Sequence, residues 1–293
     1  MPNFLIIGAA KGGTTSLYHY LNQHPQVYMS PVKEPRFFAL EGETLNFQNP
    51  DQVINHTSVT TLPEYYTLFE GVTDEVAVGE ASPLYLYSDR AVERIAHYIP
   101  EAKLIATLRN PVDRAYSCYK HLIALDPFSF AEALNQEDHR IRQNWAHLWH
   151  YRQGGYYYKQ LKRYFDKFDG QQIKIYLFDD LKSKPLDVVQ DVFSFLGVDN
   201  TFIPDLTYRN VSNNPKIKVL QNTTNGKSPV RSFFRKVLPK ELRSGLAKRV
   251  RKWNSKEFMP MSEEVRLQLI DGYREDILNL QDLIGLDLSH WLK

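Results

Sequence analysis

The sequence has a single cysteine, Cys118, among its 293 residues. One thiol cannot close an internal disulfide or build a zinc site from several cysteines, so the fold has to be held by its core alone. No apolar run approaches the roughly 20 residues that a membrane-crossing helix needs. We therefore expect no transmembrane segment, and a chain long enough to fold around a core without covalent links.

A secretion signal is also missing from the sequence. The chain begins Met1-Pro2-Asn3 and continues directly into a short apolar stretch. A signal peptide would place a basic segment and a longer apolar segment before a cleavage site. The expected location is therefore the cytoplasm.

The chain has little excess charge, because 36 Lys and Arg residues face 34 Asp and Glu residues, which gives a net charge of +2. We therefore expect no nucleic-acid partner. The charge is uneven, however: residues 216–256 carry thirteen basic residues and one acid, Glu241. We favour a surface helix with a solvated basic face for the segment 231–252. The alternative is a segment that gathers an anionic substrate or touches membrane lipid.

Hydrophobic patterning predicts an α/β fold. The expected strands span residues 3–7, 75–80, 103–108 and 173–178, and the expected helices span 14–22, 112–124, 155–168, 185–196 and 262–284. Strands that alternate with helices favour a central parallel β-sheet with helices on both faces. We expect one domain, 1–293, on which a C-terminal basic helical extension from about 231 to 293 is packed.

The segment FLIIGAAKGGTTSL, residues 4–17, joins the first strand to the first helix through three glycines. Backbone amides in such a turn, followed by a helix N-terminus, form an anion site. A Walker A loop reads G-x-x-x-x-G-K-[ST]. Gly8 and Gly13 have that spacing, but Thr14 stands where the lysine belongs and Lys11 precedes the paired glycines. The segment predicts a phosphate loop of another kind; the alternative is a tight turn capped by threonines.

A second polar motif, RNPVDRAYSCYKH, follows the third expected strand. Arg109 lies directly after that strand, and Ser117 lies in the next helix, where Arg114, Lys120 and His121 have helical spacing along one side. A guanidinium and a hydroxyl in this arrangement can bracket a phosphate monoester. The alternative is a solvated basic helix face. Parallel strands bind ligands at their carboxyl ends, so we expect the two motifs to meet there.

Together, the two motifs resemble the sulfotransferases that use 3′-phosphoadenosine 5′-phosphosulfate (PAPS), especially the heparan-type branch and its bacterial relatives. The resemblance continues through VKEPRFF (32–38), GEASPLYL (79–86), GGYYYKQLKRYFDKF (154–168) and FDDLKSKPLDVVQDVFSFLGV (178–198), and it spans most of residues 4–215. It implies a P-loop-like three-layer sandwich, PAPS as the sulfonate donor, 3′-phosphoadenosine 5′-phosphate (PAP) as the product, and no required metal ion.

The resemblance assigns roles to single residues. Lys11 matches the lysine that contacts the oxygen bridging phosphate and sulfonate. Arg109 and Ser117 match the pair that holds the 3′-phosphate, and Glu34 matches a carboxylate proposed as general base. The 5′-phosphate cradle corresponds to Gly12, Gly13, Thr14, Thr15 and Ser16. A loop that closes over the donor corresponds loosely to a segment with Arg209, Lys216 and Lys218, which could equally be a surface loop.

The acceptor side departs from the heparan-type pattern. Arg36 stands where that branch often has histidine, Ala39 where it can have an acid, and Ala81-Ser82 where it can have a lysine. Those positions contact sugar in that branch, so the replacements argue against a heparan-like acceptor. We expect the sulfonate to go to a hydroxyl or amine of a small molecule, natural product or glycan. The residues expected to bind this acceptor are Arg36, Tyr85 and Tyr87.

An alcohol acceptor also needs a group that takes its proton. Besides Glu34, the candidates are Glu80 and His121. Glu80 lies at an expected strand end, where a carboxylate can act on a substrate or, equally, orient a loop. His121 lies one turn beyond Ser117, although a lone helix histidine is more often a packing or surface residue.

Two other protein classes compete with a sulfotransferase. A P-loop kinase or NTPase acting on a small metabolite would need ATP and magnesium, and the position of Lys11 argues against it. A degenerate donor-binding or scaffold protein needs no catalytic groups, and the intact set of Lys11, Arg109 and Ser117 argues against that.

Overall fold

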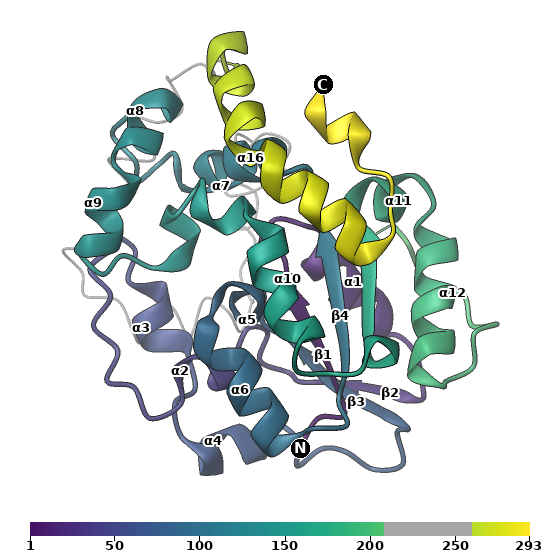
Figure 1. The fold of residues 1–293 in the computed structure, drawn as a ribbon. Coiled ribbons are helices and arrows are strands. Elements are labelled where there is room, and N and C mark those ends of the chain that lie inside the picture. Colours follow the sequence, from purple (N-terminus) through teal and green to yellow (C-terminus); the bar gives the residue numbers. More distant parts are fainter. Residues whose placement is uncertain (208–259) are drawn as a thin grey trace, which may run out of the picture.

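The computed structural model describes residues 1–207 and 260–293. In this part of the chain, five strands form one parallel sheet in the order β2-β3-β1-β4-β5 (Figure 1). The strands are β1 (Phe4–Gly8), β2 (Val27–Met29), β3 (Ala77–Ala81), β4 (Lys103–Leu108) and β5 (Ile173–Leu177).

The sheet is buried on both faces. In β1, Leu5 and Ile7 pack into one hydrophobic cluster, whereas Phe4 and Ile6 pack into the other. Successive side chains of a strand point to opposite faces, so a run of apolar residues in a parallel sheet needs cover on both sides. This explains why the sequence FLII shows no alternation of polar and apolar residues.

Helices cover both faces of the sheet and make the three-layer α/β sandwich that the sequence predicted. One face carries α1 (Thr14–Leu21), α11 (Phe178–Ser183) and α12 (Pro185–Leu196). The other carries α5 (Leu84–Tyr87), α6 (Asp89–Tyr98), α7 (Pro111–Leu122), α10 (Tyr157–Phe165) and α16 (Glu263–Ile284), as Figure 1 shows. The segment 260–293 contributes Tyr273, Ile277 and Trp291 to this second cluster.

Shorter helices border the second face and its loops. They are α2 (Phe37–Leu40), α3 (Val53–Thr57), α4 (Leu62–Thr67), α8 (Phe130–Asn135), α9 (Glu137–Arg142) and 3₁₀ turns at His147–Trp149, Gln153–Gly155, Gly170–Gln172 and Ser289–Leu292. Within the described residues, no helix is both long and apolar enough to span a membrane.

Four of the five strands lie where the apolar segments predict them, within two residues at each end. Among the elements that the sequence reasoning missed are β2, an edge strand of three residues, and α6, a helix of 10 residues whose buried face is Ala91, Val92 and Ile95. β2 is too short to give a periodic signal, but α6 has a clear amphipathic pattern that the reasoning overlooked. The basic segment 231–252 and the residues Arg209, Lys216 and Lys218 lie outside the described residues.

The order of the strands creates a crevice between β1 and β4. The chain leaves β1 toward β2 and β3, and it leaves β4 toward β5. The loops that follow β1 and β4 therefore diverge at their shared edge, which is where open α/β sheets bind ligands. Lys11 and Arg109 lie in these two loops.

Candidate active site

The loop after β1 is an anion cradle. The amide of Ala9 donates to the Thr107 carbonyl at 2.9 Å, and the amide of Gly12 donates to the Ala9 carbonyl at 2.9 Å, which fixes the turn on β4. A Cβ at Gly12 would lie 2.2 Å from the Thr107 oxygen. Gly13 has a φ of +97°, where glycine avoids strain. These constraints explain the paired glycines.

Helix α1 starts directly after the paired glycines and presents a bare N-terminus. No side chain caps its first amides, and its first turn contains no acid. The first amides of a helix lack partners within the helix, and the helix dipole adds positive potential. An anion in front of Thr14, Thr15 and Ser16 would accept hydrogen bonds from the free amides and would be attracted by the positive end of the helix dipole. The structure therefore suits a phosphate group here.

The second half of the site follows β4. Asn110 caps α7 by accepting from the amide of Val112 at 3.0 Å, and Pro111 occupies the first turn. The Arg109 carbonyl accepts from the hydroxyl of Tyr157 at 2.9 Å, and the Arg109 guanidinium lies 4.7 Å from the ring centre of Phe178. Tyr157 thus fixes the backbone of Arg109 and Phe178 packs against its guanidinium. The charge of Arg109 lies in the same cavity as the cradle.

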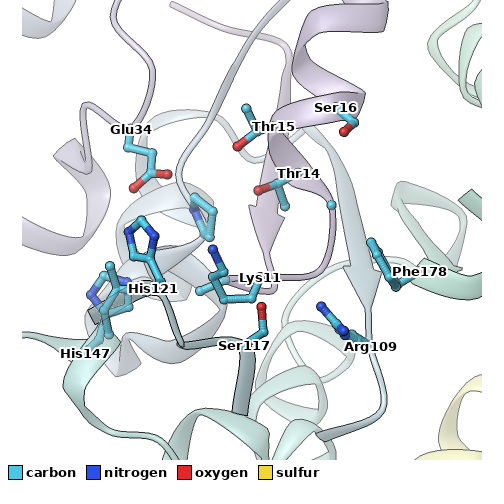
Figure 2. Close-up of a pocket in the computed structure, with 14 residues that line it drawn as sticks. Lys11, Thr14, Thr15, Ser16, Glu34, Arg109, Ser117, His121, His147 and Phe178 are labelled. Carbon is cyan, nitrogen blue, oxygen red and sulfur yellow. The ribbon is translucent and has the colours of Figure 1, made fainter. Parts of the chain in front are cut away.

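One cavity of about 380 Å³ unites both halves of the site. Of the residues expected from the sequence, it is lined by Lys11, Gly13, Thr14, Thr15, Ser16, Glu34, Arg109, Ser117 and His121. In the view of Figure 2, Lys11 lies between the Glu34 and His121 side and the Arg109 and Phe178 side. Gly12 does not line the cavity, because it lies against the backbone carbonyl of Thr107.

Lys11 is a constrained, partly buried cation. Its φ of 70° lies in the left-handed region, which side-chain-bearing residues seldom adopt. Burial lowers the pKa of Lys11 from its usual range, and Arg109 lowers it further, whereas Glu34 raises it. Strained backbone of this kind gathers at functional sites. The backbone conformation of Lys11 therefore fixes its position in the cavity wall.

Glu34 lies in a second constrained loop, residues 33–36. Its amide donates to the Ala81 carbonyl at 3.0 Å, and its φ is 62°. One carboxylate oxygen accepts from Lys33 at 2.7 Å and the other from Arg36 at 2.8 Å. Burial raises the pKa of Glu34, but Lys33 and Arg36 lower it more strongly, so its pKa falls to about 2. Glu34 is an ionised, doubly paired carboxylate.

Two histidines face the cavity near Glu34. Burial and the nearby Lys11 lower the pKa of His121 to about 4. Burial and Arg36 lower the pKa of His147 to about 3. Both imidazoles are therefore neutral at pH 7. His147 and Phe178, the aromatic neighbour of Arg109, also line the cavity, but the sequence reasoning assigned a role to neither.

Two expectations for the acceptor side need correction. Glu80 and Tyr85 are fully buried, and neither lines the cavity. Glu80 accepts hydrogen bonds from the hydroxyls of Tyr65 and Tyr85. The register pairs Glu80 with Leu5, and residues at paired positions of neighbouring strands point to the same face. Glu80 is therefore a structural carboxylate of the core, and Tyr85 is its partner.

The elevated pKa of Glu80 predicts a pH-dependent stability. Burial raises its pKa from 4.5 to about 7, although bonds from Tyr85, Ser82 and Tyr65 lower it. The stabilisation is full below about pH 4.5 and is lost as pH rises through about 7. Between about pH 5 and 8, the free energy of unfolding should fall by about 2–3 kcal/mol more in the wild-type protein than in Glu80→Gln. Urea unfolding of both proteins at each pH measures this, and equal pH slopes would contradict it.

The remaining candidates lie around the cavity. The side chain of Arg36 pairs with Glu34 and donates to Thr57 at 3.2 Å, so Arg36 shapes the loop and does not line the cavity. Tyr87 lines a neighbouring cavity.

Helix α7 presents two residues to the donor cavity. Arg114 is buried and donates to the Tyr151 carbonyl, which leaves Ser117 and His121 as the cavity-facing residues of α7. The solvated basic helix face, which the sequence offered as the alternative, therefore does not include Arg114.

Within residues 1–207 and 260–293, no three His, Cys, Asp or Glu side chains lie close enough to hold a metal ion. The positive charge of the described cavity comes from Lys11 and Arg109.

Comparison with curated proteins gives heparan-modifying relatives. The bifunctional heparan sulfate N-deacetylase/N-sulfotransferase 4 of Mus musculus is 28% identical over 306 residues, and the corresponding protein 1 of Xenopus laevis is 28% identical over 305 residues. Both alignments cover 100% of this chain and 31% of the relative. The chain thus spans about a third of the length of the curated relatives that it matches.

Solved structures and a family model agree with these matches. The structure of a sulfotransferase from Alicyclobacillus acidocaldarius is similar with a TM-score of 0.80 and 35% identity, covering 100% of this chain and 99% of that one. The sulfotransferase domain from the curacin biosynthetic pathway, 16% identical with a TM-score of 0.50, shares the fold over 94% and 98% of the two chains. These matches give no support to a kinase. The model of the sulfotransferase domain matches residues 1–258, and the chain therefore belongs to the sulfotransferase domain family.

Proposed function

We propose that this protein transfers the sulfonate of PAPS to a hydroxyl or amine of a small molecule, natural product or glycan. The observation that carries this proposal is the position of Lys11. It precedes the glycines of the cradle, yet it lines the same cavity as Thr14, Arg109 and Ser117. A cation there can reach an oxygen beyond the cradled phosphate, where the sulfonate of this donor is attached.

We propose a binding position in the cavity for each phosphate of the donor. The uncapped amides and hydroxyls of Thr14, Thr15 and Ser16 would hold the 5′-phosphate. Arg109 and Ser117 would hold the 3′-phosphate, the group that distinguishes PAPS from ATP. Phe178, against which the Arg109 guanidinium lies, offers a flat surface at the same end of the cavity (Figure 2).

Transfer then depends on positioning and on charge stabilisation. The acceptor atom bonds to sulfur while the bond from sulfur to the bridging oxygen breaks, and the electron pair stays on the 5′-phosphate. Lys11 would stabilise the negative charge that grows on this oxygen. A sulfonate carries less charge than a γ-phosphate, so we propose that a metal ion is not required.

The acceptor proton has two possible recipients in the cavity wall, Glu34 and His121. Both are deprotonated at pH 7. Each Glu34 oxygen is paired with Lys33 or Arg36, and the pKa of Glu34 is about 2, so Glu34 is a weak base while both pairs are in place. His121 is a neutral imidazole in the same wall, and we propose that it takes the proton when the acceptor leaves the Glu34 pairs intact.

Thermal unfolding with nucleotides tests the proposed donor. PAP at 100 times its Kd should stabilise the fold by about 2.7 kcal/mol and so raise Tm by several degrees. ATP with magnesium should do less, because it lacks the 3′-phosphate. Adenosine 5′-phosphate is the matched control for that group. Stabilisation by ATP with magnesium alone would favour a kinase, and no response to any nucleotide would favour a protein that has lost donor binding.

A further inference from the structure

The Glu34 loop, residues 33–38, has a backbone conformation that its residues seldom adopt. Glu34 has a φ of 62° and Arg36 a φ of 60°, and both values lie in the left-handed region, which is uncommon for residues with side chains. Such a backbone persists only where the surrounding structure determines it. One determinant is the hydrogen bond from the Glu34 amide to the Ala81 carbonyl, at 3.0 Å. This bond alone does not fix the conformation at Arg36.

Two buried hydroxyls anchor the rest of the loop. The amide of Arg36 donates to the Ser82 hydroxyl at 3.0 Å, and the amide of Phe38 donates to the Tyr85 hydroxyl at 3.4 Å. Phe38 is the second residue of α2, where an amide has no acceptor within its own helix. Ser82 and Tyr85 are fully buried, so water has no ready access to replace a hydroxyl that is removed.

Glu80 orients these two hydroxyls. Tyr85 donates its single proton to a carboxylate oxygen of Glu80, which leaves the lone pairs of the phenol oxygen for the Phe38 amide. A carboxyl oxygen can accept this proton whether the group is ionised or neutral. The Ser82 hydroxyl also faces the carboxylate, because it lowers the pKa of Glu80. Hydroxyls whose protons are committed to Glu80 present acceptor atoms to the loop.

The position of the Glu34 loop affects the groups that the proposed transfer uses. Glu34 lines the donor cavity together with Lys11 and His121, and Figure 2 shows its carboxylate directed toward His121. The negative charge of Glu34 raises the pKa of Lys11 and the pKa of His121. A displaced loop would therefore change the charge around both groups.

We propose that Ser82 and Tyr85, oriented by Glu80, are positioning residues for sulfonate transfer, which act on the reaction through the Glu34 loop. This inference rests on the proposed sulfotransferase function. Ser82, Tyr85 and Glu80 do not line the donor cavity, so the loss of their oxygen atoms leaves the residues that would hold the donor in place. These residues should therefore affect the rate of transfer and leave PAP binding unchanged.

Five variants test this assignment. Ser82→Ala and Tyr85→Phe each remove one oxygen atom, so the fold should persist. Tyr65→Phe is the matched control, because Tyr65 is also fully buried and its hydroxyl donates to Glu80 at 3.3 Å, but the anchoring amides of the loop donate elsewhere. Glu80→Gln keeps an oxygen that can accept the Tyr85 proton, whereas Glu80→Met has a similar length and no oxygen.

Three measurements are made on each variant and on the wild-type protein. Hydrogen exchange with mass spectrometry follows the amides of residues 33–40, and calorimetry gives the Kd of PAP. Single-turnover assays give the rate of transfer from PAPS to the first member of a panel of alcohols, phenols and amines that the wild-type protein sulfonates.

Loop exchange should rise roughly 10-fold in Ser82→Ala and in Tyr85→Phe, the factor that the loss of one hydrogen bond can give. The transfer rate should fall about 10-fold. This is less than the roughly 10²-fold that a misplacement of 1 Å can cost, because the other anchors remain. The Kd of PAP should not change. Tyr65→Phe and Glu80→Gln should resemble the wild-type protein, and Glu80→Met should resemble Tyr85→Phe.

Loop exchange or transfer rates in Ser82→Ala and Tyr85→Phe that match those of Tyr65→Phe would overturn the proposal. Identical behaviour of Glu80→Gln and Glu80→Met would remove Glu80 from it. A loss of PAP affinity as large as the loss of rate would show that the variants disturb the donor site and not the loop alone. If the wild-type protein bound no PAP or sulfonated no panel member, the proposed function would fail, and the exchange data would still measure the anchors.

Discussion

Replacing Lys11 with alanine should lower kcat by about 10³-fold and leave the affinity for intact PAPS nearly unchanged. The reason is that Lys11 would meet a negative charge that develops on the bridging oxygen as its bond to sulfur breaks and that is absent from intact PAPS. The loss of one preorganised donor to such a developing charge costs roughly 10²–10³ in rate. In the proposed binding mode, the amides and hydroxyls of residues 12–16 and Arg109 hold most of PAPS, so its binding should depend little on this lysine.

Single-turnover transfer assays, and calorimetry with PAPS in the absence of an acceptor, measure the two parts of this expectation. Lys120→Ala is the matched control, because Lys120 lies on the same helix as Ser117 but over the ring of Tyr116, 4.9 Å from its centre, and does not line the cavity. It should transfer sulfonate at nearly the wild-type rate. Near-normal turnover in Lys11→Ala would remove the lysine from the bridging oxygen. A large loss of affinity for intact PAPS would assign it to donor binding.

Replacing Arg109 with alanine should weaken PAP binding by about 10- to 100-fold. A hydrogen bond to a charged group contributes roughly 1.5–3 kcal/mol, which corresponds to a factor of this size in Kd. Adenosine 5′-phosphate, which has no 3′-phosphate, should bind the variant and the wild-type protein about equally. The variant should therefore lose most of its preference between the two nucleotides.

Arg109→Lys refines this test, because it keeps the charge but loses the planar fork that fits a phosphate. We expect it to recover part of the affinity for PAP. Calorimetry with both nucleotides gives the four constants that are needed. If Arg109→Ala weakened both nucleotides by the same factor, the arginine would hold a part that they share, and the 3′-phosphate would have to be held elsewhere.

The donor side of this site was predictable from the sequence because it depends on local patterns. A buried strand followed by glycines and hydroxyls fixes the cradle, and the rule that parallel strands end at one edge brings Arg109 to Lys11. The apolar segments at 103–108 and 173–178 were long enough to give β4 and β5 nearly residue by residue. Each of these features lies within one strand and the turn after it.

The acceptor side was less predictable because it depends on register and on distant segments. Glu80 was expected at the end of a strand, but β3 continues to Ala81, and pairing with Leu5 turns Glu80 into the core. Tyr85 was expected to bind the acceptor, but residues 84–87 form the helix α5, in which Tyr85 is fully buried. His147 reaches the cavity from a 3₁₀ turn that carries no recognisable motif.

The two ion pairs of Glu34 have a consequence for the donor when no acceptor is bound. A free carboxylate beside an activated sulfonate could draw a proton from water and so promote hydrolysis of the donor. Here Lys33 and Arg36 occupy both oxygens, and the pKa of about 2 leaves little affinity for a proton. Under the proposed function, Glu34 would therefore contribute little to hydrolysis of the donor before an acceptor arrives, and His121 would be the remaining base in the cavity wall.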